Sequence, residues 1–147
     1  MINFKIADIS DIDMIYKLSK ENIDMYEDIT KINYEKVLDW VKRKIHDNIS
    51  SYKAIYYNGE KVGYFNFHEE NNKLEIDDLY IFEMYRDKGI GTMIIKDCIK
   101  ESNEKNIPIF LYVFSKNTKA VSLYTRLGFE ITEKIKDTRY IMERGCI

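Results

Sequence analysis

Hydrophobic and polar residues alternate along this chain with two different periods, and the changes of period mark its elements. The segment Ile2–Ala7 alternates with a period of two, which predicts a half-buried strand. Apolar residues then recur at helical spacing over Ile12–Leu18, behind an acidic first turn that Ser10 precedes, and over Tyr34–Ile45, behind Asn33. Because short polar side chains cap helices at their amino ends, the pattern predicts two amphipathic helices with Ser10 and Asn33 as caps.

The period returns to two after the second helix. Two alternating segments, Tyr52–Tyr57 and Lys61–Glu69, flank Asn58-Gly59, a pair that suits the positive φ angles of a type I′ turn, so they predict a hairpin. The remaining pattern predicts, in chain order, a strand over Lys73–Phe82, a helix over about 89–104, a strand over Ile109–Phe114, a short helix from Asn117 or Thr118 to Gly128, and strands over Phe129–Ile135 and Arg139–Glu143. The order β-α-α-β-β-β-α-β-α-β-β favours an α+β fold, with helices on both faces of a mixed, mostly antiparallel sheet.

Composition adds few constraints to this pattern. The chain has 147 residues, one proline and no Gly/Ser-rich stretch, so we expect a single domain over residues 1–147. A formal net charge of −2 argues against a general nucleic-acid binder, which carries a clustered basic excess. Cys98 and Cys146 stand far apart and outside any C-x-x-C pair, so we expect two reduced thiols and neither a disulfide nor a zinc site.

The sequence shows no targeting or membrane segment. Its first residues contain no basic stretch followed by an apolar run, and its apolar runs are too short to span a bilayer. We therefore expect a cytoplasmic protein with no membrane partner, and the choice between a monomer and a homodimer stays open.

The turn that follows the strand ending at Phe82 carries the most informative residues. Gly89 and Gly91 remove side chains at the start of a helix, where backbone N–H groups and partial positive charge favour a bound phosphate. Arg86 and Lys88 add positive charge beside them. These residues predict a site for a pyrophosphate group, and the alternative is a tight turn with two incidental glycines.

Two common phosphate-binding motifs do not fit this turn. No Gly-Lys-Ser/Thr follows it, so it is not a P-loop. Ile94 stands where the third glycine of a dinucleotide fingerprint belongs, and no early βαβ unit surrounds it.

Two spaced blocks instead resemble the GNAT family of N-acetyltransferases. Arg86-x-x-Gly89-x-Gly91 resembles its signature R/Q-x-x-G-x-G/A, and Asn117–Phe129 resembles its block N-x-x-A-x-x-x-Y-x-x-x-G-F. Glu83 departs from the family, since many members have proline there. The resemblance covers nearly the whole chain and implies the GNAT fold and an acetyl-CoA-dependent enzyme that acetylates a primary amine of a small molecule or a protein.

The resemblance also implies how acetyl-CoA is held. Main-chain groups of Leu79, Tyr80 and Ile81 would bind the pantetheine arm like an added strand, in a gap where this strand splays from Ile109–Phe114. Asn117 matches a position that contacts the arm, and a helix cap is its alternative role. The pyrophosphate contacts would come from the turn, namely Arg86, Asp87, Lys88, Gly89, Ile90, Gly91 and Thr92.

The resemblance further implies acid–base chemistry without a metal. Tyr124 matches the family's general acid, whose phenol donates to the leaving thiolate of the cofactor. Glu75 and Asp77 match positions of a base that acts directly or through water. A strand period of two places these carboxylates on one face and Asp78 on the other. Solvated strand charges are the alternative interpretation, and His68 is a more remote candidate for the base.

The acceptor is predicted from a different set of residues. In the family the acceptor site is shaped by the first two helices, their connecting loop and the final strands. Here residues 22–31, predicted to be a loop, contain Asp24, Glu27 and Asp28, which with the strand carboxylates favour a cationic amine such as a polyamine or an amino sugar. A solvated acidic loop with no role in substrate binding is equally consistent with these residues. Trp40 either packs in the core or lines the acceptor pocket. A non-catalytic acetyl-CoA-binding module and a transferase for a longer acyl-CoA stay open.

Overall fold

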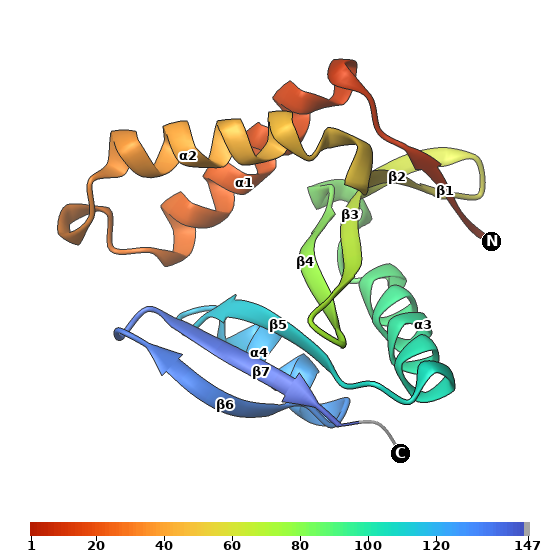
Figure 1. The fold of residues 1–147 in the computed structure, drawn as a ribbon. Coiled ribbons are helices and arrows are strands. Elements are labelled where there is room, and N and C mark those ends of the chain that lie inside the picture. Colours follow the sequence, from red (N-terminus) through yellow and green to blue (C-terminus); the bar gives the residue numbers. More distant parts are fainter. Residues whose placement is uncertain (146–147) are drawn as a thin grey trace.

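The computed structural model describes residues 1–145, so Cys146 lies outside the described residues. Within them, seven strands form one sheet in the order β1-β2-β3-β4-β5-β7-β6, and four α-helices pack against it (Figure 1). The strands are β1 Ile2–Ile6, β2 Tyr52–Tyr57, β3 Glu60–Glu70, β4 Lys73–Ile81, β5 Ile109–Phe114, β6 Glu130–Ile135 and β7 Arg139–Arg144. The helices are α1 Ile12–Tyr26, α2 Tyr34–Asp47, α3 Ile90–Lys105 and α4 Thr118–Arg126. None of these helices is long and apolar enough to cross a membrane.

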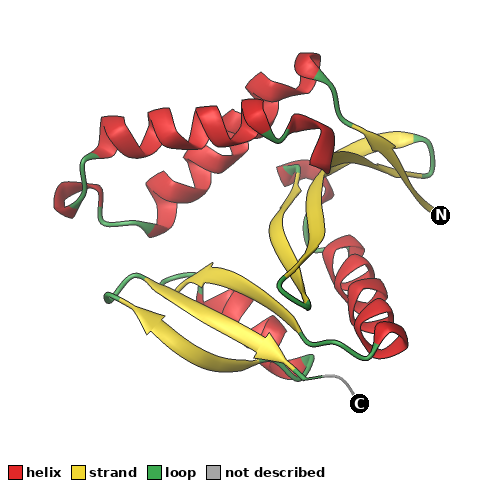
Figure 2. Ribbon diagram, in the orientation of Figure 1, coloured by secondary structure: helices red, strands yellow, loops and turns green. Residues whose placement is uncertain are grey.

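Helices cover both faces of the sheet, which confirms the predicted α+β class (Figure 2). On one face, α1 and α2 bury Ile15 and Ile45 against Tyr52 and Tyr64 of the sheet. On the other face, α3, α4 and the segment that follows α4 form a second core with β3, β4, β5 and β7. Its fully buried members include Ile94, Ile95, Leu111, Phe129 and Met142.

The two halves of the sheet meet at the single parallel pair of strands, β4 and β5. Their pairing covers only Leu74–Ile76 against Ile109–Leu111. Beyond it, Asp77–Ile81 has no partner strand on the β5 side among the described residues, because β5 continues in pairing with β7 alone. The predicted splay between these strands is therefore confirmed, and it leaves a stretch of unpaired strand edge on β4.

A β-bulge in β4 changes the direction of its side chains. Asn66 of β3 pairs with Asp78, while the next residue, Phe67, pairs with Ile76, so Asp77 is an extra residue in β4. A bulge interrupts strict alternation. As a result Lys44 of α2 lies close to both Asp77 and Asp78, and the prediction that Asp78 points to the opposite face is wrong.

The first helix also differs from its prediction. It continues to Tyr26, so the first five residues of the predicted acidic loop are helical. Ile23 explains this, because it is buried in the core between α1 and α2. Ser10 is not the cap; Asp8 accepts hydrogen bonds from the backbone and hydroxyl of Ser10 in a short 3-10 turn before the helix. Asn33 caps α2 as predicted.

Candidate functional site

A cleft of about 1140 Å³ lies where β4 and β5 part. Its walls come from α1 and α2, from the splayed strands, from α4 and from the turn between β6 and β7. The structure thus brings together, around one cavity, six residues that the sequence predicted for the site: Glu75, Asp77, Leu79, Tyr80, Asn117 and Tyr124.

Tyr124 projects from α4 toward this cleft. Its ring packs edge-on against Phe129, with ring centroids 5.7 Å apart, and this contact fixes the ring on the core side of α4. Burial raises the pKa of the Tyr124 phenol to about 12, and nearby Cys98 acts in the same direction. The phenol therefore stays protonated at neutral pH and can donate a proton.

The two carboxylates proposed as the base have different surroundings. Asp77 Oδ1 accepts a hydrogen bond from Lys44 Nζ at 2.8 Å, in an ion pair that is largely shielded from solvent. Glu75 is buried, with 8% of its surface exposed, and faces His68 on β3. Burial, and then the charge of Asp77, raise the pKa of Glu75 above its ordinary value. Glu75 therefore holds a proton more tightly than an ordinary glutamate does.

Behind these groups lies a hydrogen-bond network that the sequence did not reveal. Asp78 accepts hydrogen bonds from the phenols of Tyr52 and Tyr80. Burial raises the pKa of Asp78, while Lys44 opposes that effect. Burial works against the charged form of Lys44, but Asp78 and Asp77 outweigh it and raise the Lys44 pKa. The network fixes the acidic wall of the cleft against α2.

The turn predicted to bind pyrophosphate begins the helix α3, just after β4 ends. Gly89 has φ +81° and precedes the first helical residue, so a glycine suits this left-handed position. No side chain caps the helix at Gly89, which leaves the first backbone N–H groups available for an anion. Ile90 is buried and anchors the turn. A Cβ at Gly91 would meet only Ile81 at 4.0 Å, so packing within the chain does not require glycine there.

Two charged residues of the turn are engaged by the protein itself. Arg86 Nε donates to the backbone carbonyl of Ile81 at 2.8 Å, which ties the turn to the end of β4. Asp87 forms an ion pair with Lys119 of α4 at 2.7 Å. Lys88 lies in the same turn, and Thr92 lies in the first turn of α3.

Asn117 does act as a helix cap. Its Oδ1 accepts a hydrogen bond from the backbone of Ala120 at 3.2 Å. Because Asn117 also lines the cleft, capping does not remove it from the site.

The first two helices and their connection do wall the cleft, but their acidic residues are partly neutralised. Glu27 and Asp28 line the cleft together with the cationic Lys31. Asp24 does not line it, and instead bonds Lys20 at 2.9 Å and Tyr34 at 2.5 Å. Trp40 lies in the cleft wall and is 56% exposed. Lys116, Lys136 and Arg139 also line the cleft, so its wall carries both signs of charge, and its acidic residues are most concentrated on β4.

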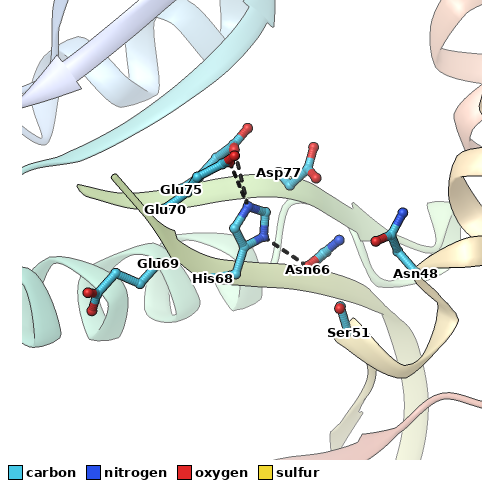
Figure 3. A pocket seen from close by; sticks show the side chains of 8 residues that line it. All are labelled: Asn48, Ser51, Asn66, His68, Glu69, Glu70, Glu75 and Asp77. Atoms are coloured by element: carbon cyan, nitrogen blue, oxygen red, sulfur yellow. Dashed lines mark hydrogen bonds and ion pairs between the residues drawn. The ribbon is translucent and has the colours of Figure 1, made fainter. Parts of the chain in front are cut away.

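A second, smaller cavity of about 450 Å³ adjoins the cleft, and we call it the side pocket (Figure 3). Glu75 and Asp77 line both cavities. Figure 3 shows the carboxylates of Glu70 and Glu75 beside the ring of His68. Polar atoms of these three residues lie within 4.8 Å of one another, close enough to hold a metal ion, so the expectation of chemistry without a metal stays a prediction. His46, by contrast, is exposed near the end of α2.

Comparison with known proteins connects this geometry to a family. The model of the acetyltransferase (GNAT) family matches residues 9–129. A spermine/spermidine N(1)-acetyltransferase of Bacillus subtilis is 33% identical over 92 residues, which cover 56% of this chain and 60% of that protein. This chain thus spans less than two thirds of that relative's length. Acetyltransferase PseH of Campylobacter jejuni is 25% identical over 142 residues, which cover 95% of this chain and 89% of the relative.

Solved structures share the fold over the full chain. PaiA N-acetyltransferase from Thermoplasma acidophilum, in complex with coenzyme A, superimposes with a TM-score of 0.70 and 22% identity, over 99% of both chains. At this identity the likeness concerns the fold alone.

Proposed function

Because this chain belongs to the acetyltransferase (GNAT) family, we propose that it transfers the acetyl group of acetyl-CoA to a primary amine bound in the cleft. One observation carries the proposal: the unpaired edge of β4 borders the same cavity as Tyr124 and Glu75. An extended pantetheine arm can pair with that edge as an added strand. Its thioester would then lie between a proton donor and a proton acceptor.

The proposed donor site runs from β4 to the start of α3. Main-chain groups of Leu79, Tyr80 and Ile81 bind the arm, with Arg86 already occupying the carbonyl of Ile81. The pyrophosphate binds the uncapped amino end of α3, over Asp87–Thr92. Support comes from the coenzyme A held by the Thermoplasma protein of the same fold.

In the proposed reaction Glu75 is the base and Tyr124 the acid. An ammonium substrate must lose a proton before its nitrogen can attack the thioester carbonyl. Glu75, whose pKa is raised by burial, accepts that proton directly or through water, whereas Asp77 is held by Lys44. Tyr124 donates its proton to the sulfur as the thiolate leaves, and the second proton, which the nitrogen loses as the amide forms, restores the phenol.

We propose a cationic amine as acceptor, with polyamines as the first candidates. The carboxylates of Glu75 and Asp77 stand in the cleft wall, and the side pocket adds those of Glu69 and Glu70. No Lys or Arg is among the residues that line the side pocket. The relative from Bacillus subtilis named for spermine and spermidine supports this choice of substrate class.

The test combines binding with turnover. Acetyl-CoA should raise the thermal unfolding temperature, and thiol release should follow when spermidine is added, with glucosamine and a peptide that has a free amino end as comparison acceptors. Tyr124→Phe should lower kcat about a hundredfold or more and leave acetyl-CoA affinity nearly unchanged. Tyr140→Phe is the matched control, because Tyr140 packs against the same core but does not line the cleft.

The outcomes separate the alternatives. Binding of acetyl-CoA without thiol release on any amine would favour a binding module over an enzyme. Unchanged turnover in Tyr124→Phe would remove Tyr124 from the role of the acid. Faster thiol release from a longer acyl-CoA than from acetyl-CoA would show that the longer acyl group is the one transferred.

A further inference from the structure

His68 and Glu75 are directly opposite each other on neighbouring antiparallel strands. The Nε2 atom of His68 lies 3.2 Å from Oε1 of Glu75 and 3.7 Å from Oε2 of Glu70 (Figure 3). The other ring nitrogen, Nδ1, lies 3.4 Å from Oδ1 of Asn66, a buried residue. This contact is a hydrogen bond when Nδ1 carries the ring hydrogen, and in that tautomer the lone pair of Nε2 faces Glu75.

Glu75 stands between two cavities of different character. It lines the cleft, where the amine would bind, and also the side pocket, which is lined mainly by polar residues. The side chain of His68 is 33% exposed and that of Glu70 is 60% exposed, while that of Glu75 is only 10% exposed. A proton on Glu75 therefore has a short route to water through His68.

The groups that face Glu75 favour this route over others. Lys44 of α2, which already carries its protons, cannot accept one. Asp77 is paired with Lys44, while a carboxylate oxygen of Glu70 lies within 4.8 Å of polar atoms of both His68 and Glu75, and its charge helps to raise the pKa of Glu75. Burial and Asp77 raise the pKa of Glu75, whereas His68 and Lys44 lower it. Among the residues that the structure describes, His68 combines direct contact with Glu75 and, with the ring hydrogen on Nδ1, an unused lone pair on Nε2.

We propose that His68 is the positioning and proton-accepting partner of Glu75, so that the two side chains work as one base. This inference rests on the proposed function. At neutral pH the reaction of an ammonium substrate with acetyl-CoA yields the amide, the free thiol and one proton. That proton passes from the substrate nitrogen to Glu75 and then to Nε2 of His68, leaving a carboxylate–imidazolium pair. Nε2 then releases it to water in the side pocket.

The proposal predicts how kcat depends on pH. The base of the wild type is a coupled pair, so the acid limb of its profile belongs to the pair rather than to one residue. The charge of His68 lowers the pKa of Glu75. In His68→Gln the base is a single carboxyl group that has lost this neighbour, so the limb should move to higher pH.

The experiment measures kcat against pH with spermidine, or with the best acceptor of the panel above. His68→Gln should also lower kcat above about pH 8 roughly tenfold, while the KM for acetyl-CoA stays unchanged. His46→Gln is the matched control, because His46 is exposed on α2 and lines neither the cleft nor the side pocket. Urea unfolding of each variant at the assay pH values separates acid unfolding from a true shift of the limb.

Three results would overturn the inference, and they are distinguishable. If Glu75→Gln abolishes turnover but His68→Gln keeps the wild-type acid limb, His68 is not the partner, and the proposed function stands. If Glu75→Gln keeps full turnover, Glu75 is not the base, and that part of the proposed function is wrong as well. If EDTA abolishes wild-type turnover and Zn²⁺ or Mn²⁺ restores it, the cluster of His68, Glu70 and Glu75 holds a metal ion instead.

Discussion

The ammonium of Lys44 lies 2.8 Å from the carboxylate of Asp77. This ion pair joins the helix α2 to the bulge of β4, and a second oxygen, Oδ2 of Asp78, lies 4.0 Å from the same ammonium. Side-chain exposures are 26% for Lys44 and 18% for Asp77, so solvent screens the pair only in part. Lys44 therefore neutralises Asp77 and leaves Glu75 as the carboxylate that we propose as the base.

Lys44→Met should both destabilise the fold and change the pH profile. Two partly buried carboxylates would lose their positive partner, at a cost of about 1–3 kcal/mol in the free energy of unfolding, discounted for partial exposure. Because Lys44 also lowers the pKa of Glu75, its removal should move the acid limb of kcat to higher pH. Urea unfolding and pH profiles measure these effects.

A matched control for this variant lies one half-turn earlier in α2. Lys42 is exposed, and its ammonium lies over the ring of Tyr16. Lys42→Met should change stability by no more than about 0.5 kcal/mol and leave the pH profile in place. Equal effects of both substitutions would show that the loss of any positive charge from α2 is responsible.

Gly63 of β3 lies directly against the part of β4 proposed to bind the pantetheine arm. A Cβ at this position would stand 1.9 Å from the backbone oxygen of Tyr80, so backbone would have to move. Gly63→Ala should lower the free energy of unfolding by about 1–3 kcal/mol and weaken acetyl-CoA binding. Gly145→Ala, where nothing lies within 4 Å, is the control. Unchanged affinity in Gly63→Ala would argue against the arm binding beside Tyr80.

Local signals account for what the sequence predicted correctly. Asn58 and Gly59 adopt φ angles of +51° and +87°, as a type I′ turn needs. Asn33 and Asn117 cap the helices that begin beside them. These features depend on residues close together in the chain, and the two GNAT blocks, which confirm the family, are local patterns of the same kind.

The sequence pattern did not predict features that depend on contacts between segments far apart in the chain. The bulge at Asp77 exists only in the register of β4 against β3, so a strict period of two gave the wrong face for Asp78. The pair of His68 and Glu75 depends on the same register. The length of α1 is set by packing, because Ile23 is buried against the second helix although its neighbours in sequence are polar.

A second carboxylate network, remote from the cleft, should control stability at acid pH. Asp11 Oδ1 accepts hydrogen bonds from Lys61 at 2.9 Å and from Tyr64 at 2.6 Å. Burial alone would raise the pKa of Asp11, but the hydrogen bonds from Tyr64, the Asp8 backbone and Lys61 outweigh it and lower the pKa. A lowered pKa stabilises the fold fully above the unfolded value of about 3.9, and this contribution is lost as the pH falls through the folded value.

Asp11→Asn should therefore cost about 1–3 kcal/mol near pH 7, and the difference from wild type should shrink below about pH 4. Urea unfolding at both pH values measures it. Asp13→Asn, two residues away and exposed, should have little effect at either pH. A difference between wild type and Asp11→Asn that is independent of pH would place the effect in packing rather than in charge.

The raised pKa of Tyr124 predicts the alkaline side of the rate profile. An ordinary tyrosine ionises at about pH 10, and a general acid with that pKa would lose its proton, and its function, above that pH. Burial raises the pKa of Tyr124 to about 12, so its phenol is still mainly protonated at about pH 10. We therefore expect that ionisation of Tyr124 causes no decline of the wild-type kcat at about pH 10 when the acceptor is saturating. Any decline seen there should persist in the residual activity of Tyr124→Phe, and a decline that disappears in this variant would contradict the assignment of a buried, protonated acid.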